Sequence, residues 1–222
     1  MKVHTAKYLA SLTCLFLLFA TTTLKADWSG ISASIEELES DWVFENNTRS
    51  ARVSRLNLSF EEKTRSELRV GANIGRLSAS TSNEIGPRNT RKYDASYFGV
   101  YLRYPIQLGD YFALKNKLTY QYHSGSESNI NGDEGAEIDW REISFELGLS
   151  AKLANLRITP FAIYNDVSGD ISDDTGTDSF ESDSEVSGGV SIDVFLEPTA
   201  FIRLRFSTGD YDSASMIFAR EF

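Results

Sequence analysis

The chain has 222 residues, with 22 Lys and Arg against 32 Asp and Glu, and a formal net charge of −10. Nucleic acid is a poor partner for such an acidic chain, because binding to phosphates depends on Lys and Arg. The only cysteine is Cys14, so no intramolecular disulfide stabilises the protein. One domain held together by its own packing is expected.

A cleaved signal peptide is expected over residues 1–26. Lys2 and Lys7 precede an uncharged apolar run, Tyr8–Ala20, and Ala26 is a small residue suited to cleavage. The apolar run is shorter than the about 20 residues of a spanning helix, although a retained anchor is the alternative. Cleavage leaves residues 27–222 as the mature domain, with a formal charge of −13.

Apolar residues recur at every second position throughout the mature domain, which is the pattern of strands with two unlike faces. In the strand that begins at Tyr93, for example, Phe98, Val100 and Leu102 share one face. The first strand is irregular, because its apolar residues change parity between Ile35 and Leu38, and a β-bulge there is the expected cause. Ten strands are expected, with eight as the alternative, over residues 28–44, 52–60, 67–77, 93–104, 111–123, 137–151, 156–166, 186–196, 200–207 and 214–222.

The connections between these strands alternate in length. Every second one is short, whereas residues 78–92, 124–137 and 166–184 form long polar loops. Short turns at one end and long loops at the other are typical of an outer-membrane barrel, with the short turns in the periplasm. We therefore expect an all-β fold, a closed antiparallel transmembrane up-and-down β-barrel, with apolar faces toward lipid and with Trp42, Phe44, Tyr120 and Tyr122 near the outer interface.

The mature chain resembles small outer-membrane β-barrel proteins of Gram-negative bacteria, of the OmpA/OmpX/OmpW-like kind, without matching a subfamily. Phe218 and the terminal Phe222 are similar to the C-terminal aromatic signal of such barrels, although Arg220 occupies a position that is usually apolar there. The resemblance implies export to the cell outer membrane, assembly by the barrel-assembly machinery through the C-terminal strand, and contact with lipid and lipopolysaccharide. It implies no cofactor.

Charged side chains on the polar faces predict a cross-strand network that fills the lumen. Lys115 and Lys117 precede the loop 124–137, and Glu142 and Glu146 follow it. We expect Lys115 opposite Glu146, or Lys117 opposite Glu142. Asp193 and Arg203 flank a short turn symmetrically and are expected to pair.

Two sets of residues are weaker candidates for chemistry. His123, the only histidine of the mature domain, could act as the base for Ser126 in a lipid-A hydrolase. Asp170, Ser172, Asp174 and Asp178 have part of the spacing of a calcium loop, but Thr175 stands where such loops turn at glycine. A solvated acidic loop and a rim histidine without a catalytic role are the simpler interpretations. A structural or surface-interaction protein that is not an enzyme is expected; a narrow porin-like channel and a lipid-A-modifying hydrolase are the alternatives.

Overall fold

The fold is described from a computed structural model. It describes residues 28–45, 47–64, 66–82, 91–128, 135–174, 176–182 and 186–222. The expected signal peptide lies outside the described residues and stays a prediction. Within the described ranges, no helix has the length and hydrophobicity needed to cross a membrane.

The described chain is built almost entirely of strands. All ten expected strands are present, and several extend further than expected, while β5 and β9 are additional short strands. The strands are β1 (Trp28–Phe44), β2 (Asn47–Lys63), β3 (Arg69–Ser82), β4 (Arg91–Arg103), β5 (Ile106–Gln107), β6 (Phe112–Glu127), β7 (Glu137–Leu153), β8 (Leu156–Asp173), β9 (Gly176–Ser182), β10 (Val186–Glu197), β11 (Ala200–Gly209) and β12 (Tyr211–Glu221).

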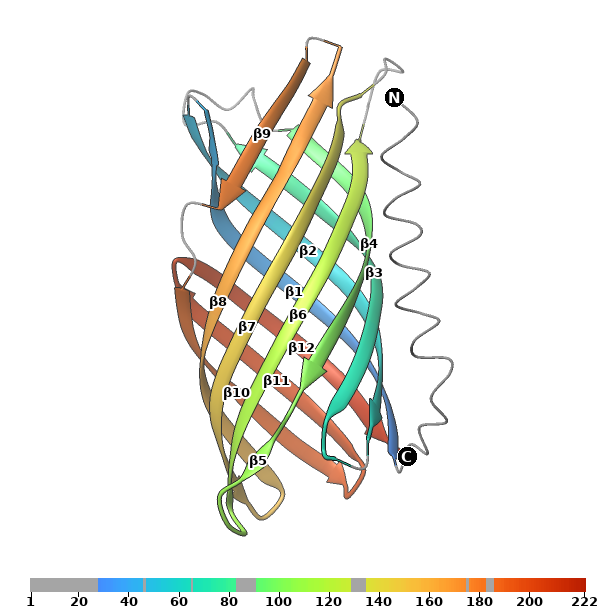
Figure 1. Cartoon of the computed structure of the whole chain (residues 1–222), viewed down its shortest axis with the longest axis vertical. Helices are drawn as coiled ribbons and strands as arrows, with labels where there is room; N and C mark the ends of the chain where they lie inside the picture. Colours follow the sequence, from blue (N-terminus) through green and yellow to red (C-terminus); the bar gives the residue numbers. More distant parts are fainter. Residues whose placement is uncertain are drawn as a thin grey trace.

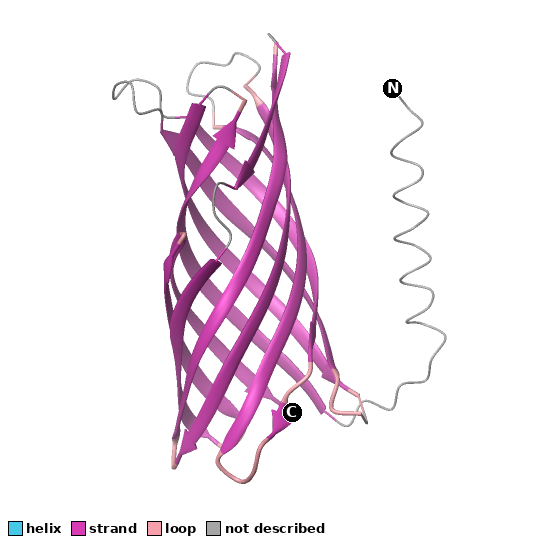
Figure 2. Cartoon of the chain, turned by 60° about the vertical axis from the view of Figure 1, so that its left-hand side comes forward, coloured by secondary structure: helices cyan, strands magenta, loops and turns pink. Residues whose placement is uncertain are grey.

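The strands form an elongated antiparallel barrel (Figures 1 and 2). In the lower part, as drawn in Figure 1, pairing runs from β1 through β2, β3, β4, β6, β7 and β8 to β10, β11, β12 and back to β1. In the upper part, β9 pairs with both β8 and β1 and replaces the last three strands. The described barrel therefore has ten strands below and eight above, so each of the two expected counts applies at a different height.

Described residues 166–174 and 176–182 do not form the long polar loop that was expected over residues 166–184. Residues up to Asp173 continue β8, and Gly176–Ser182 returns along it as β9 in unbroken antiparallel register. Ile171 and Phe180 project from this hairpin into the interior of the barrel and are buried. The polar composition was misleading, because the outer face of the hairpin is exposed to solvent.

The bulge expected in β1 is also absent. Pairing with β2 runs without a register shift from Trp28 opposite Lys63 to Phe44 opposite Asn47. Ile35 is 56 % exposed on the outside of the barrel, whereas Trp42 is only 2 % exposed on the inside. Trp42 and Phe44 therefore do not belong to an interfacial girdle, and the change of parity has a different cause.

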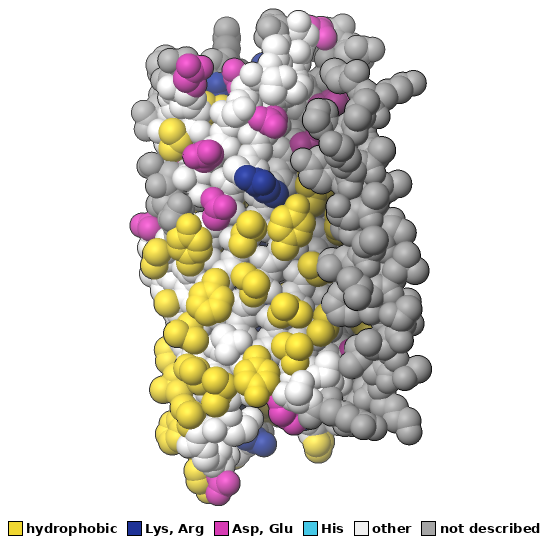
Figure 3. Space-filling view, viewed as in Figure 1, with side chains coloured by type: hydrophobic (Ala, Val, Ile, Leu, Met, Phe, Trp, Pro, Cys, Tyr) yellow, Lys and Arg dark blue, Asp and Glu magenta, His cyan; other side chains and the backbone are white. Residues whose placement is uncertain are grey.

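That cause is an inversion of the two faces of the sheet between the lower and upper barrel, which β2 shows most clearly. Its lower outward residues are apolar, with Leu56 58 % exposed, and the neighbouring inward residues are polar. Above Arg55 the pattern reverses, since Val53 is buried inside and Arg52 is exposed outside. In Figure 3, hydrophobic side chains correspondingly gather over the lower part of the visible face and charged ones over the upper part.

Close packing between adjacent strands also shapes the wall at the height of this inversion. The ring of Tyr97 on β4 lies across Gly75 on β3, directly opposite in register. A Cβ atom at Gly75 would come within 2.2 Å of the Leu56 carbonyl oxygen and 2.6 Å of the Tyr97 ring. Only glycine fits this position without displacing the backbone of β2.

Candidate functional site

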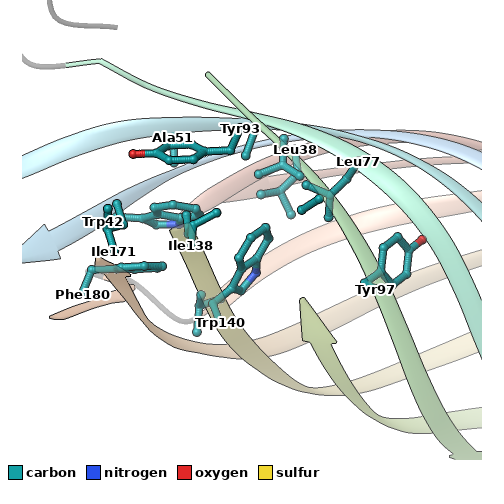
Figure 4. Close-up of a cluster of buried hydrophobic side chains, with 14 of the residues drawn as sticks. Leu38, Trp42, Ala51, Leu77, Tyr93, Tyr97, Ile138, Trp140, Ile171 and Phe180 are labelled. Atoms are coloured by element: carbon teal, nitrogen blue, oxygen red, sulfur yellow. The ribbon is translucent and has the colours of Figure 1, made fainter. Parts of the chain in front are cut away.

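The interior of the upper barrel is filled by buried apolar side chains, called the upper cluster. Trp42 stacks on Phe180 with ring centroids 4.4 Å apart and lies 5.8 Å from the ring of Trp140 (Figure 4). These rings come from β1, β9 and β7, so the cluster joins strands across the barrel. Its members are Leu38, Trp42, Phe44, Ala51, Val53, Leu77, Ala79, Tyr93, Ala95, Tyr97, Ala136, Ile138, Trp140, Val167, Ile171, Phe180 and Tyr211.

Directly below the upper cluster lies a layer of buried polar groups, called the boundary layer. The Arg55 guanidinium on β2 donates to a Glu142 carboxylate oxygen on β7 at 2.5 Å and to the Gln121 side-chain oxygen at 3.3 Å. Glu36 on β1 is 3.6 Å from the same guanidinium. The contact joins opposite walls of the barrel, β2 and β7. Removing either charge would leave the other buried without its partner, which makes this contact costly to break.

His123 completes the boundary layer and is fully buried. Its ring stacks on the Trp140 ring of β7, with centroids 4.3 Å apart and the planes nearly parallel. On the other side, the centroid of the Tyr97 ring on β4 lies 5.2 Å away. The apolar outer face of β6 ends at Tyr122, so His123 is the first residue above the lipid-facing segment. Burial, together with the nearby Arg55 charge, lowers the pKa of His123 to about 3. The imidazole is therefore neutral at physiological pH.

The structure does not bring Ser126 to His123. The two residues are three positions apart on β6 and face opposite sides of the sheet, His123 inward and Ser126 outward into solvent. A nucleophile and its base must be within hydrogen-bond reach. The expected Ser–His arrangement is wrong, because alternation along a strand separates residues at odd spacing.

The lower lumen contains the expected pair of Asp193 and Arg203. These residues are directly opposite on β10 and β11, and the guanidinium binds both carboxylate oxygens, at 2.6 and 2.9 Å. Arg157 on β8 reaches the same carboxylate at 3.0 Å. A short turn constrains register strongly, so symmetrical positions around it become neighbours.

The expected pairing across the β6–β7 loop is wrong in register. Lys117 lies opposite Glu146, Lys115 lies opposite Gly148, and Glu142 lies opposite Gln121. Neither glutamate uses a lysine as its closest partner, since Glu146 binds Arg205 at 2.6 Å across the lumen and Glu142 binds Arg55. Both strands extend into the residues assigned to the loop, and the loop length therefore did not define the register.

A second carboxylate centre, around Glu61 on β2, was missed in the sequence. Its two oxygens face Arg69 at 3.1 Å and Arg103 at 3.3 Å. The signal was available, because Glu61 shares the parity of Arg55 and continues the polar inward face of β2. The partners could not be identified, since three different strands contribute the charges.

Between the boundary layer and the lower rim the lumen encloses a cavity of about 220 Å³. Lys115, Lys117 and Arg203 line its middle, and Glu221 and Gly30 line it at the lower rim. The walls are polar over most of their height, unlike the apolar interior of the upper cluster.

The expected calcium ligands lie in the β8–β9 hairpin. Asp170 accepts a hydrogen bond from Ser179 at 2.7 Å, and the Ser172 and Thr177 hydroxyls are 3.0 Å apart across the strands. Asp178 lies opposite Ile171 and so faces away from Asp170. Within the described ranges no three acidic, histidine or cysteine side chains are grouped to hold a metal ion. Paired strands hold Asp170, Ser172 and Asp178 in an extended hairpin, whereas a calcium loop wraps around its ion.

The proposed assembly residues lie at the end of the last strand. Phe218 faces outward on β12 and is half-exposed, and Phe222 follows the strand and is exposed. Their role in assembly stays a prediction.

Comparison with known proteins places the fold. No protein-family model matches the chain, and no curated protein is significantly similar in sequence. Among solved structures, the β domain of the Bordetella autotransporter BrkA is 14 % identical, with a TM-score of 0.53, and the match covers 88 % of this chain and 100 % of that one. The translocator domain of the autotransporter NalP from Neisseria meningitidis is 15 % identical over 99 % of this chain and 97 % of that one, with a TM-score of 0.47. Neisserial surface protein A is 11 % identical over 87 % and 97 %, also with a TM-score of 0.47.

Identities this low show the fold alone. The chain has the fold of a small Gram-negative outer-membrane β-barrel, as its similarity to the BrkA β domain shows, and no subfamily is distinguished.

Proposed function

We propose that this protein is a non-conducting barrel of the bacterial outer membrane that holds a rigid, solvent-exposed upper segment above the membrane for structural or surface interactions. The observation that carries the proposal is the upper cluster, which fills the eight-stranded part of the barrel with packed apolar side chains from β1, β4, β7 and β9. Ions and polar solutes do not cross a packed apolar interior, because they would lose their hydration there.

The orientation follows from the outer surface and from the strand lengths. β1, β2 and β7 each have 17 residues, which at about 3.3 Å per residue and a tilt of about 40° is roughly 43 Å. The lipid-facing band of such barrels is about 25 Å tall. With the apolar lower exterior in lipid, close to 18 Å of upper barrel extends beyond the membrane, and the short lower turns face the periplasm.

The exterior of the upper segment is acidic. Glu37 and Glu39 on β1 and Asp170 on β8 are exposed there, and Asp139 on β7 is partly exposed. A basic partner fits this surface, and divalent cations could bridge its carboxylates to the phosphates of lipopolysaccharide. A rigid surface has a lower ordering cost on binding than a flexible loop, which suits a surface-interaction role.

The decisive experiment is conductance across a planar lipid bilayer with folded protein, using a general porin as the positive control. No steady channel is expected from the wild type. A steady ohmic channel would overturn the proposal and favour the narrow porin-like alternative, which the cavity in the lower lumen supports. Membrane fractionation followed by heat-modifiable migration on a denaturing gel tests location and barrel folding together.

A further inference from the structure

We propose that the lower lumen is a binding site for a small, multiply charged, water-soluble anion that enters from the lower rim. The inference goes beyond the proposed function, and only the periplasmic side of entry rests on the orientation proposed there. It begins with a difference in charge between the lumen and the whole chain. The chain has a formal charge of −10, yet the cavity is lined by more cationic side chains than carboxylates.

The carboxylates of the lower lumen already have arginine partners. Asp193 is bound by Arg157 and Arg203. Glu146 is bound by Arg205. Positive charge on other side chains is therefore not neutralised by these groups.

Lys115 and Lys117 are the lysines of the lower lumen that these carboxylates do not bind. Within the described residues neither ammonium has a carboxylate within 4.0 Å. The Lys115 amine is 3.5 Å from the Thr159 hydroxyl, and the Lys117 amine lies 4.7 Å from the centre of the Tyr101 ring. Two positions apart on β6, they project from the same face into the same cavity, about 7 Å apart along the strand.

The surroundings of these lysines are also cationic. Arg103 lies directly opposite Lys117 on β4. Arg203 lines the same cavity, and Arg157 binds the same Asp193 carboxylate as Arg203. Like charges repel strongly inside a protein, where screening by water is weak. An anion with two or more charges, placed between the two ammonium groups, reduces this repulsion. It accepts from donors that form no ion pair within 4.0 Å, although Glu146 lies opposite Lys117 on β7.

The shape of the lumen determines from which end an anion can enter. The cavity of about 220 Å³ reaches the lower rim at Gly30 and Glu221, whereas the boundary layer and the upper cluster close it above. A continuous ring of paired strands encloses it laterally. A soluble oxyanion such as a polyphosphate or a small polycarboxylate fits this route, and it would come from the periplasmic side.

Pyrophosphate is the probe for the test. Folded full-length mature protein in a non-ionic detergent is titrated with pyrophosphate at pH 7 and low salt by isothermal calorimetry. Saturable binding at one site is expected, with little or no heat from acetate, because a single charge does not span both lysines.

Variants decide whether the binding is in the lumen. Lys115→Met with Lys117→Met is expected to weaken binding at least tenfold, and Lys115→Gln alone at least threefold if the double variant does not fold. Lys152→Met removes an exposed lysine at the β7–β8 turn and is the matched control, with less than a twofold effect expected. Absence of pyrophosphate binding, or equal weakening by Lys152→Met, would overturn the proposal. If both lysines were neutral they would not need an anion, and pyrophosphate would not bind.

Discussion

Replacing Trp42 by alanine tests whether the upper barrel has an apolar interior. Trp42 is 2 % exposed, stacks on Phe180 at 4.4 Å and contacts the ring of Trp140. Removing a buried tryptophan costs about 3–5 kcal/mol, through lost transfer energy and the cavity that remains. We expect a loss of that size in the free energy of unfolding, of which about 0.5–1.5 kcal/mol comes from the aromatic contacts.

The assay is urea unfolding of the barrel in lipid vesicles, followed by heat-modifiable migration and tryptophan fluorescence. Val43→Ala is the matched control, because Val43 is adjacent on β1 and faces outward at the same height. It is expected to cost no more than about 1 kcal/mol, as a partly exposed residue.

A double-mutant cycle with Phe180→Ala separates stacking from general loss of packing. A coupling energy of about 0.5–1.5 kcal/mol between Trp42 and Phe180 is expected for rings in direct contact. If Trp42→Ala cost no more than Val43→Ala, the indole would face outward and the inversion of the sheet would be refuted.

Three further predictions concern the boundary layer and the wall around it. Arg55→Met leaves Glu142 buried and charged without its partner, so a loss of about 3–5 kcal/mol in unfolding free energy is expected, and adding Glu142→Gln should recover part of it; no recovery would contradict the pairing. Burial lowers the pKa of His123 to about 3 in the folded state, whereas an unfolded histidine titrates near 6.5. The contribution of neutral His123 to the free energy of unfolding is therefore complete above about pH 6.5 and falls as the pH decreases toward 3. Between pH 7 and pH 5 the wild type should lose about 2 kcal/mol more than His123→Phe, and equal losses in urea midpoints would show that the imidazole is not buried. Gly75→Ala introduces a Cβ atom against the backbone of β2 and the ring of Tyr97, so a cost of about 1–3 kcal/mol is expected; wild-type stability in the same urea assay would show that this contact is loose.

The candidate site was only partly predictable from the sequence. Asp193 and Arg203 could be paired because a short turn leaves little freedom in register. Lys115 and Lys117 could be placed on the inner face, but their opposite residues could not be identified, since the loop after β6 is shorter than its polar sequence indicated. The contact between Arg55 and Glu142 joins β2 to β7 across the lumen. Such contacts depend on how the barrel closes, and no local pattern contains that information.

The parity change in β1 is a second feature that the local sequence pattern could not explain. The sequence contains the change between Ile35 and Leu38, and a bulge was a reasonable local explanation. The unbroken register with β2 excludes it. What changes is the environment of each face, because the barrel narrows to eight strands and β9 supplies Phe180 to its interior.

The amino-acid sequence by itself determined the class of fold: alternating runs with unlike faces require a sheet, and the sorted connections indicate a barrel of about ten strands. Period-two alternation is a local property of an extended chain, so it survives without knowledge of distant neighbours. Only the tertiary structure decided which face is inside at each height, because that depends on strand number, register and closure across the whole ring. For the same reason it alone revealed a lumen that is polar below and apolar above.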